Sequence, residues 1–321
     1  MPRPLCSLSL DLDNLWSYLK THGDPGWDTY PSYLETIVPR VLALLKARGQ
    51  KITWFIVGKD AAEPAHHPVL REITRQGHEV GNHSFHHEPW LHLYAERQIE
   101  DELSRTEDAI EAATGARPEG FRGPGFSFSP TLLTVLARRG YRYDCSTFPT
   151  FLGPLARMYY FATAKGLTAD EKAQRKQLFG KLSEGFRPLA PYTWNTGAGP
   201  LLEIPVTTIP VMKTPFHLSY ILFLAGFSKA AARAYLRVAV TMCKATGIEP
   251  SFLLHPLDFL GCDDTDRLAF FPAMKRPHAE KLEFVVEVFD LLAREFTLVP
   301  MGDHATAAAR RLAAVTPVPV G

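Results

Sequence analysis

Strand-like and helix-like segments alternate along most of the 321 residues, and this alternation constrains the fold more than any other feature of the sequence. Apolar residues recur at helical spacing from residue 33 to residue 48, and a short β-rich apolar run follows at residues 52–57. Further helices are predicted at 69–76, 94–114, 130–139, 229–245 and 278–294, and strands near Leu5 and at 79–82, 120–122, 141–144, 201–206, 251–255 and 297–300. Repeated strand–helix units with short connections are typical of a parallel sheet or a barrel.

The region from Ser146 to Pro200 interrupts this alternation. It holds two helical pieces, at residues 155–164 and 168–182, and an aromatic segment at residues 192–194. We expect an insertion over the mouth of the barrel, with ordinary structural packing as an equal alternative.

Two short motifs have the spacing of metal-site residues. His83 and His87 are four residues apart, so a helical turn or a tight helical loop places both imidazoles on one face, where a zinc-type ion takes nitrogen ligands. Asp11 and Asp13 are two residues apart, so on a strand their carboxylates point the same way. One aspartate can ligate the metal while the other acts as a base. The pattern indicates a mononuclear metallohydrolase.

Each motif also has a plainer interpretation. The chain has twelve histidines, so one such pair can arise by chance, and aspartates two residues apart are common in solvated turns. Position along the chain favours the metal site, because both motifs follow short apolar strands. Chemistry in α/β folds is placed at the carboxyl ends of strands.

Charge and chain ends bear on partners and location. Thirty-five basic and thirty-four acidic residues give a net charge of +1, which argues against a general grip on nucleic acid. The first strand begins near Leu5 and leaves no room for a targeting segment, so we expect a cytoplasmic protein.

The apolar run at residues 218–227 is shorter than the roughly 20 residues of a spanning helix. It is either a buried helix, which we favour, or a surface that touches membrane or a lipid chain.

Three more motifs follow predicted strands. Arg122 begins the segment Arg-Gly-Pro-Gly, Asp144 ends one strand, and His255 ends another. Singly, these residues fit a surface cation, a turn cap and a packed core histidine. Taken in order with the aspartate and histidine motifs, they resemble the polysaccharide deacetylase family, carbohydrate esterase family 4, which shares the chitooligosaccharide deacetylase homology domain. The resemblance extends from about Leu5 to Pro300, outside the region 146–200.

The resemblance implies a fold and a domain arrangement. The family fold is a deformed (β/α) barrel of about seven strands with one divalent metal ion at its carboxyl-terminal mouth. Residues 1–300 would form this catalytic domain, with the insertion at about 146–200, and residues 301–321 would be a C-terminal tail. Sites with two histidines and one aspartate accept zinc, cobalt, nickel or manganese, and we expect zinc.

The resemblance also implies a role for each matching residue. Asp13, His83 and His87 would hold the metal, Asp11 would be the general base, Arg122 would pair with Asp11, His255 would be the general acid, Asp144 would lie behind His255 and favour its protonated form, and the Ser84 hydroxyl would steady the histidine loop. A backbone N–H near Gly125 would help to hold the oxyanion.

The chain departs from the family pattern around the substrate groove. Gly125 followed by Phe126 stands where a bulky aromatic residue is usual, and the tryptophan expected beyond Asp144 is missing. These departures put the identity of the substrate in question more than the reaction type. Trp194 and Asp258 are further candidate substrate contacts, and Asp258 is alternatively a helix cap or a support for neighbouring site residues.

These roles imply a metal-dependent hydrolase that removes an acetyl or formyl group from the nitrogen of an amino sugar or glycan. A cytoplasmic location would favour a sugar nucleotide or a lipid-linked amino sugar at the inner membrane face, with peripheral membrane contact. One alternative is a metal-independent hydrolase of a non-peptide C–N bond, and another is a carbohydrate-binding module without catalysis. The complete ligand set, with Asp11 and His255 both present, argues against these alternatives.

Overall fold

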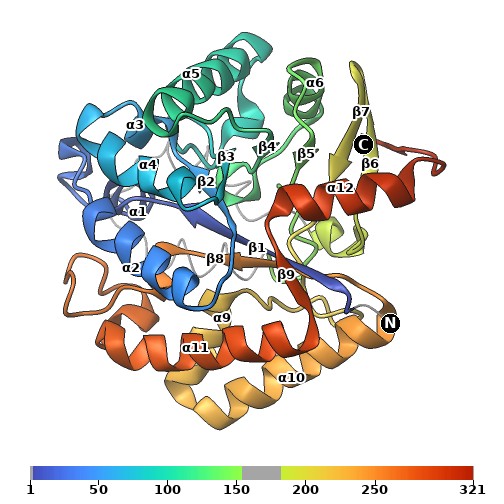
Figure 1. Ribbon diagram of the computed structural model, residues 1–321. Helices are drawn as coiled ribbons and strands as arrows, with labels where there is room; N and C mark the ends of the chain where they lie inside the picture. The colour runs from blue at the N-terminus through green and yellow to red at the C-terminus, as the bar shows by residue number, and fades with distance from the viewer. Residues whose placement is uncertain (1–2, 154–181, 321) are drawn as a thin grey trace.

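The computed structural model describes residues 3–153 and 182–320, so the helical pieces expected at 155–164 and, for nearly all its length, at 168–182 lie outside the described residues. Seven parallel strands lie side by side within these ranges (Figure 1). In spatial order they are β8 (Ser251–Leu254), β1 (Leu5–Leu12), β2 (Thr53–Ile56), β3 (Glu79–Asn82), β4 (Gly120–Phe121), β5 (Tyr143–Asp144) and β7 (Gly199–Glu203).

The chain beyond β7 returns to β8 and closes the barrel. The backbone N–H of Thr207 donates to the carbonyl oxygen of Ser251 at 3.1 Å, and the N–H of Ser251 donates to Oγ1 of Thr207 at 2.8 Å. Strands β4 and β5 have only two residues each, so the barrel is deformed. The fold is the (β/α) barrel of about seven strands that the sequence predicts.

Helices cover the outside of the barrel in the order of the strand–helix units (Figure 1). They are α2 (Leu34–Ala47), α4 (His67–Arg75), α5 (Glu96–Thr114), α6 (Pro130–Arg138), α10 (Lys229–Thr246) and α11 (His278–Glu295), with the short α3 (Gly58–Ala61) after β2. Each of the long helices buries one apolar stripe, as the helical spacing predicts. In α2 this stripe runs from Leu34 to Leu45.

The C-terminal region is part of the barrel rather than a tail. Helix α12 (Met301–Leu312) lies across the amino-terminal ends of the strands. Two hydrogen bonds anchor its first turn there: Met301 N–H donates to Thr53 Oγ1 at 2.7 Å, and Gly302 N–H donates to Glu79. The side chains of Met301, Ala305 and Ala308 pack against Phe55 and Tyr143 in the barrel interior. Strand β9 (Thr297–Val299) pairs with β1, and β10 (Val318–Pro319) pairs with β6 (Tyr192–Thr196).

The described part of the expected insertion adds to the edge of the sheet. Strand β6 (Tyr192–Thr196) is antiparallel to β7 and contains the aromatic segment. This segment therefore lies in the sheet and not over the mouth.

Two helices complete the mouth. Helix α1 (Leu15–His22) follows β1, and Asn14 caps it by accepting from Leu15 N–H. Helix α9 (Leu218–Phe227) matches the apolar run and buries Leu218, Ile221, Leu222 and Ala225, while Phe227 is exposed. None of the helices in the described ranges is both long enough and apolar enough to span a bilayer.

Candidate active site

The side chains of Asp13, His83 and His87 converge at the carboxyl-terminal mouth of the barrel. Nε2 of His83 lies 3.3 Å and Nε2 of His87 lies 2.8 Å from Oδ1 of Asp13, and all three residues are buried. One candidate ligand atom from each residue lies within 4.8 Å of the others. The structure thus brings together the three residues that the sequence analysis predicts as metal ligands.

The hydrogen bonding of His83 fits a metal ligand. Its Nδ1 lies 2.6 Å from the carbonyl oxygen of Arg122, and because a carbonyl only accepts, Nδ1 is the donor. The lone pair of Nε2 is then directed at the cluster, which is the tautomer a metal needs. Burial by itself raises the pKa of Asp13, but His87 and His83 hold it well below its usual range, so a carboxylate faces the two imidazoles. The donor set fits one divalent ion.

The loop that carries the two histidines is not helical. Ser84 and His87 have positive φ angles, 59° and 53°, so the chain turns through the left-handed region to bring both rings to Asp13. The Glu102 carboxylate on α5 holds this loop by accepting from Phe85 N–H at 2.8 Å and His86 N–H at 3.1 Å.

The implied role of the Ser84 hydroxyl is not borne out. Its oxygen is buried without a hydrogen-bond partner among the described residues. The loop is supported instead by Glu102 and by Asn82 Oδ1, which accepts from Ser84 N–H. The sequence analysis did not single out Glu102, because nothing in its helical segment distinguishes it from the other acidic residues.

Asp11 and Arg122 form a buried ion pair beside the metal-type cluster. Nη1 of Arg122 lies 2.9 Å from Oδ1 of Asp11 and 2.9 Å from Oγ of Ser9, and its Nε donates to the carbonyl oxygen of Cys145. The guanidinium is fully buried against the Phe55 ring. Burial by itself lowers the pKa of Arg122, but Asp11 raises it above its ordinary value. The predicted pairing is confirmed.

His255 lies directly after β8. This strand pairs with β1 on the side opposite to β2. The register Leu10↔Leu254 places His255 beside Asp11 in the sheet. Nδ1 of His255 lies 2.9 Å from Oγ of Ser219 on α9. Its backbone N–H donates at 2.8 Å to Asp258 of the 3-10 helix η7 (Pro256–Asp258). Asp258 thus caps this turn, and its buried carboxylate supports His255.

Asp144 does not lie behind His255 as the resemblance implies. Its Oδ1 accepts from the Ser146 hydroxyl at 2.6 Å, and it is the register partner of Glu203 on β7. Burial, and next the Glu203 carboxylate, raise the pKa of Asp144 well above its usual range. Among the described residues, no hydrogen bond or ion pair joins Asp144 to His255. Because the same Ser146 hydroxyl accepts from Gly123 N–H at 2.8 Å, the carboxylate supports the Arg122 loop instead.

Aromatic rings form one side of the mouth next to His255. Phe126 stacks on Phe148 with ring centroids 4.7 Å apart, Phe148 contacts His217 at 5.9 Å, and His217 contacts His255 at 5.9 Å. Burial lowers the pKa of His217 to about 3, so this ring is neutral. Gly125 and Phe126 both have φ near +59°, which turns the Arg122 loop toward these rings.

Trp194 does not face the mouth. It is 1% exposed, and its Nε1–H donates to Glu203 at 3.0 Å within the sheet. The prediction that Trp194 contacts substrate is therefore wrong in this structure. Strand β6 turns its ring into a core cluster with Leu201 and Tyr192, and the sequence alone does not reveal which face of an edge strand is covered.

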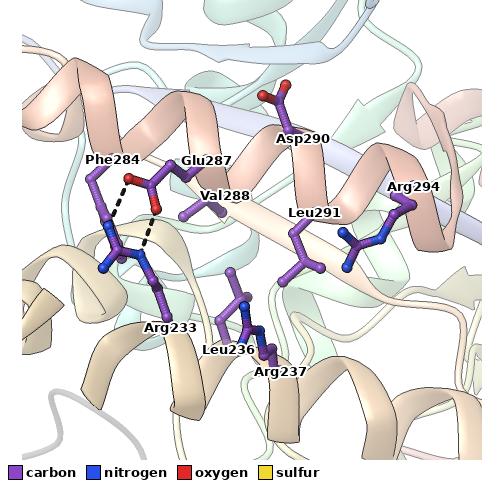
Figure 2. Close-up of a pocket in the computed structure, with 9 residues that line it drawn as sticks. All are labelled: Arg233, Leu236, Arg237, Phe284, Glu287, Val288, Asp290, Leu291 and Arg294. Atoms are coloured by element: carbon purple, nitrogen blue, oxygen red, sulfur yellow. Dashed lines mark hydrogen bonds and ion pairs between the residues drawn. The ribbon is translucent and has the colours of Figure 1, made fainter. Parts of the chain in front are cut away.

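Two other features lie away from this site. Asp263, Asp264 and His278 form a more exposed cluster, but Asp264 is bound by both Nη1 and Nη2 of Arg40. A groove between α10 and α11 on the outside of the barrel is drawn in Figure 2, where Arg233 pairs with Glu287 over apolar side chains. The groove is lined by none of the predicted site residues.

Comparison with known proteins agrees with the fold and the motifs. The polysaccharide deacetylase family model matches residues 24–143. A peptidoglycan deacetylase of Helicobacter pylori is 30% identical over 146 residues, which cover 44% of this chain and 49% of that protein. The peptidoglycan-N-acetylmuramic acid deacetylase PdaA of Bacillus subtilis is 32% identical over 111 residues, covering 34% of this chain and 41% of that protein. The aligned regions thus span half or less of these relatives.

A solved structure matches over nearly the whole chain. A Mycobacterium smegmatis protein whose name places it among the polysaccharide deacetylases superposes with a TM-score of 0.63 at 20% identity, covering 99% of this chain and 93% of that one. The barrel and the Asp-His-His cluster at its mouth define the class, a (β/α) barrel with a metal-type site. Residues 24–143 of the chain match the polysaccharide deacetylase family model, and the fold is that of the Mycobacterium smegmatis protein.

Proposed function

We propose that this protein hydrolyses the N-acyl group of an amino sugar or glycan, releasing acetate and a free amine. One observation carries the proposal: the Asp13, His83 and His87 ligand atoms lie together beside the Asp11–Arg122 ion pair. Amide hydrolysis needs an electrophile and a base in adjacent positions; Asp13, His83 and His87 would hold the metal that supplies the first, and Asp11, paired with Arg122, would be the second. The match of residues 24–143 to the polysaccharide deacetylase family model supports the same reaction.

Asp13, His83 and His87 are proposed to hold one divalent ion, with zinc the expected metal. Two imidazole nitrogens and one carboxylate oxygen are a donor set that zinc accepts while keeping a position open. A bound zinc ion polarises an amide carbonyl and lowers the pKa of water. The side chains around the cluster would carry out the remaining steps of the hydrolysis.

Asp11 is proposed as the general base. Arg122 binds one oxygen of its carboxylate, so the carboxylate is oriented before substrate binds. Asp11 would take a proton from the attacking water. His255, on the neighbouring strand, would then give a proton to the leaving nitrogen as the C–N bond breaks. The Arg122 loop near Gly125 would supply a backbone N–H to the oxyanion.

The test is release of acetate or formate from a panel of substrates. N-acetylglucosamine oligomers, peptidoglycan fragments and N-formyl amino sugars would be incubated with the zinc-loaded protein and with Asp11→Asn. We expect turnover by the parent and a loss of at least about 100-fold in Asp11→Asn, because the base is removed with little change in shape. Turnover of Asp11→Asn at the parental rate would remove Asp11 from the mechanism.

A lipid-linked amino sugar at the inner membrane face is a second candidate substrate. Ser219 on α9 contacts His255, and the far end of the same helix exposes Phe227 at 78% and Phe223 at 37%. Exposed rings next to the mouth suit a lipid chain or a membrane surface. Co-sedimentation with liposomes, compared between the parent and Phe223→Ser/Phe227→Ser, tests this contact. Equal sedimentation of the two proteins would rule out a role for these rings.

A further inference from the structure

We infer that Ser219 and Asp258 orient His255, whereas the family resemblance places Asp144 behind this histidine. The catalytic meaning of this inference depends on the proposed function, because His255 is the acid only if the protein hydrolyses an amide. The arrangement of the three residues is independent of the substrate.

The Ser219 hydroxyl fixes one nitrogen of the ring. Its Oγ lies 2.9 Å from Nδ1 of His255 and comes from the first turn of α9. A hydroxyl can accept the Nδ1–H of the imidazolium, which leaves the Nε2–H as the free donor. The ring is therefore held in one orientation by α9, and the proton that can be donated sits on Nε2.

Asp258 binds the backbone of His255 through its buried carboxylate. Its Oδ2 accepts from His255 N–H at 2.8 Å, and its Oδ1 is buried without a hydrogen-bond partner among the described residues. Burial raises the pKa of Asp258, while His255, its backbone N–H and Ser219 oppose this shift.

The charged groups around His255 come from several elements. Asp258 lies in η7, Lys281 on α11 donates to the Leu257 carbonyl at 2.6 Å, and His217 precedes α9 with its ring 5.9 Å away. Tyr18 of α1 lies within the electrostatic reach of Asp258. Burial lowers the pKa of His217 to about 3 and that of Lys281 to about 8. The acidic groups beside His255 are thus Asp258, which binds its backbone N–H, and Asp11 on the neighbouring strand β1.

The Asp144 carboxylate supports the loop that carries Arg122 instead of His255. It accepts from Ser146, whose Oγ in turn accepts from Gly123 N–H at 2.8 Å. This chain of hydrogen bonds ends at the loop that carries Arg122. Asp144 is therefore a positioning residue for the base side of the site, and Ser219 with Asp258 serves the acid side.

The experiment follows the titration of the His255 ring by NMR in protein labelled with ¹⁵N-histidine. His255→Gln identifies the signal, and the variants are Asp258→Asn, Ser219→Ala and Asp144→Asn. Ser219→Thr keeps the hydroxyl, and Ser228→Ala, at the other end of α9, is the control. Circular dichroism verifies that each variant is folded. We expect the titration midpoint of His255 to fall by at least about half a pH unit in Asp258→Asn and to stay in place in Asp144→Asn.

Ser219→Ala should change the tautomer ratio of neutral His255, while Ser219→Thr and Ser228→Ala should not. In pH–rate profiles, the alkaline limb should move to lower pH in Asp258→Asn, because the acid form is lost earlier. A larger shift of the midpoint in Asp144→Asn than in Asp258→Asn would overturn the inference. If the parent hydrolyses no N-acyl sugar, the proposed function fails, and the titration alone decides the positioning of His255.

Discussion

The carbonyl oxygen of Arg122 lies 2.6 Å from Nδ1 of His83, so the residue that pairs with Asp11 also sets the tautomer of a metal ligand. The backbone of Arg122 acts on the metal side of the site and its guanidinium acts on the base side. Both contacts follow from the position of Arg122 directly after β4, next to β3 in the barrel. A shift of this loop would therefore disturb both functions together.

Removal of the Arg122 side chain should destabilise the fold. In Arg122→Met the Asp11 carboxylate stays buried without its partner, and we expect a loss of about 3–5 kcal/mol in the free energy of unfolding. In Arg122→Met/Asp11→Asn the buried charge is gone, and we expect part of the lost free energy of unfolding to be regained. Urea unfolding of the parent, the two single variants and the double variant measures this coupling. Strictly additive losses would show that the two side chains are not coupled.

Glu102 should control the affinity for metal without touching it. Glu102→Gln weakens its bonds to Phe85 and His86 N–H, so the loop carrying His83 and His87 becomes less ordered, and we expect zinc affinity to fall about 10–100-fold. Competition with a chelating dye measures the affinity. Glu111→Gln, on the same helix but exposed, is the control. Equal affinities in both variants would refute the supporting role of Glu102.

Trp194 should matter for stability and not for substrate binding. Trp194→Phe removes the bond from Nε1–H to Glu203 and should cost about 1–2 kcal/mol of unfolding free energy. Because the ring lies in the sheet, the KM for an accepted N-acyl sugar should stay at its parental value. A raised KM with unchanged stability would show that Trp194 contributes to substrate binding.

His78 should make stability depend on pH. Burial, and next Lys51, lower its pKa from 6.5 to about 4, and its Nδ1 accepts from Ile52 N–H at 3.2 Å. The folded state then binds this proton less readily than the unfolded state. The stabilisation is complete above pH 6.5 and is lost as the pH falls toward 4. The loss should be about 2 kcal/mol after allowance for solvent screening.

The measurement for His78 is the free energy of unfolding between pH 7 and pH 4, compared with His78→Gln. The difference between the two proteins should change by the expected amount across this range. A constant difference would mean that another group causes the pH dependence.

Prediction from the sequence is most accurate for elements whose structure depends on a single local segment. Strand β3 and helix α9 match their predicted bounds, because alternation and helical spacing are local signals. The convergence of Asp13, His83 and His87 also follows, since parallel strands end at the same side of a barrel. The partners of Asp144 could not be predicted, because they depend on its register with Glu203. The contact from Ser219 to His255 depends on how α9 packs, which local spacing does not encode.

The C-terminal region shows the same limit. Residues 301–312 are rich in alanine and suggest little, yet α12 covers the amino-terminal end of the barrel through Met301, Gly302 and His304. The need for a cover at that end arises only once the strands have closed.

The central claim is the metal centre, and elemental analysis of the purified protein tests it most directly. We predict about one equivalent of a divalent metal, expected to be zinc, in the parent and little in His83→Ala. His278→Ala, at the other cluster of metal-type side chains, should keep the parental content. A parent without metal, or His83→Ala with undiminished metal, would contradict the proposed site and the mechanism that depends on it.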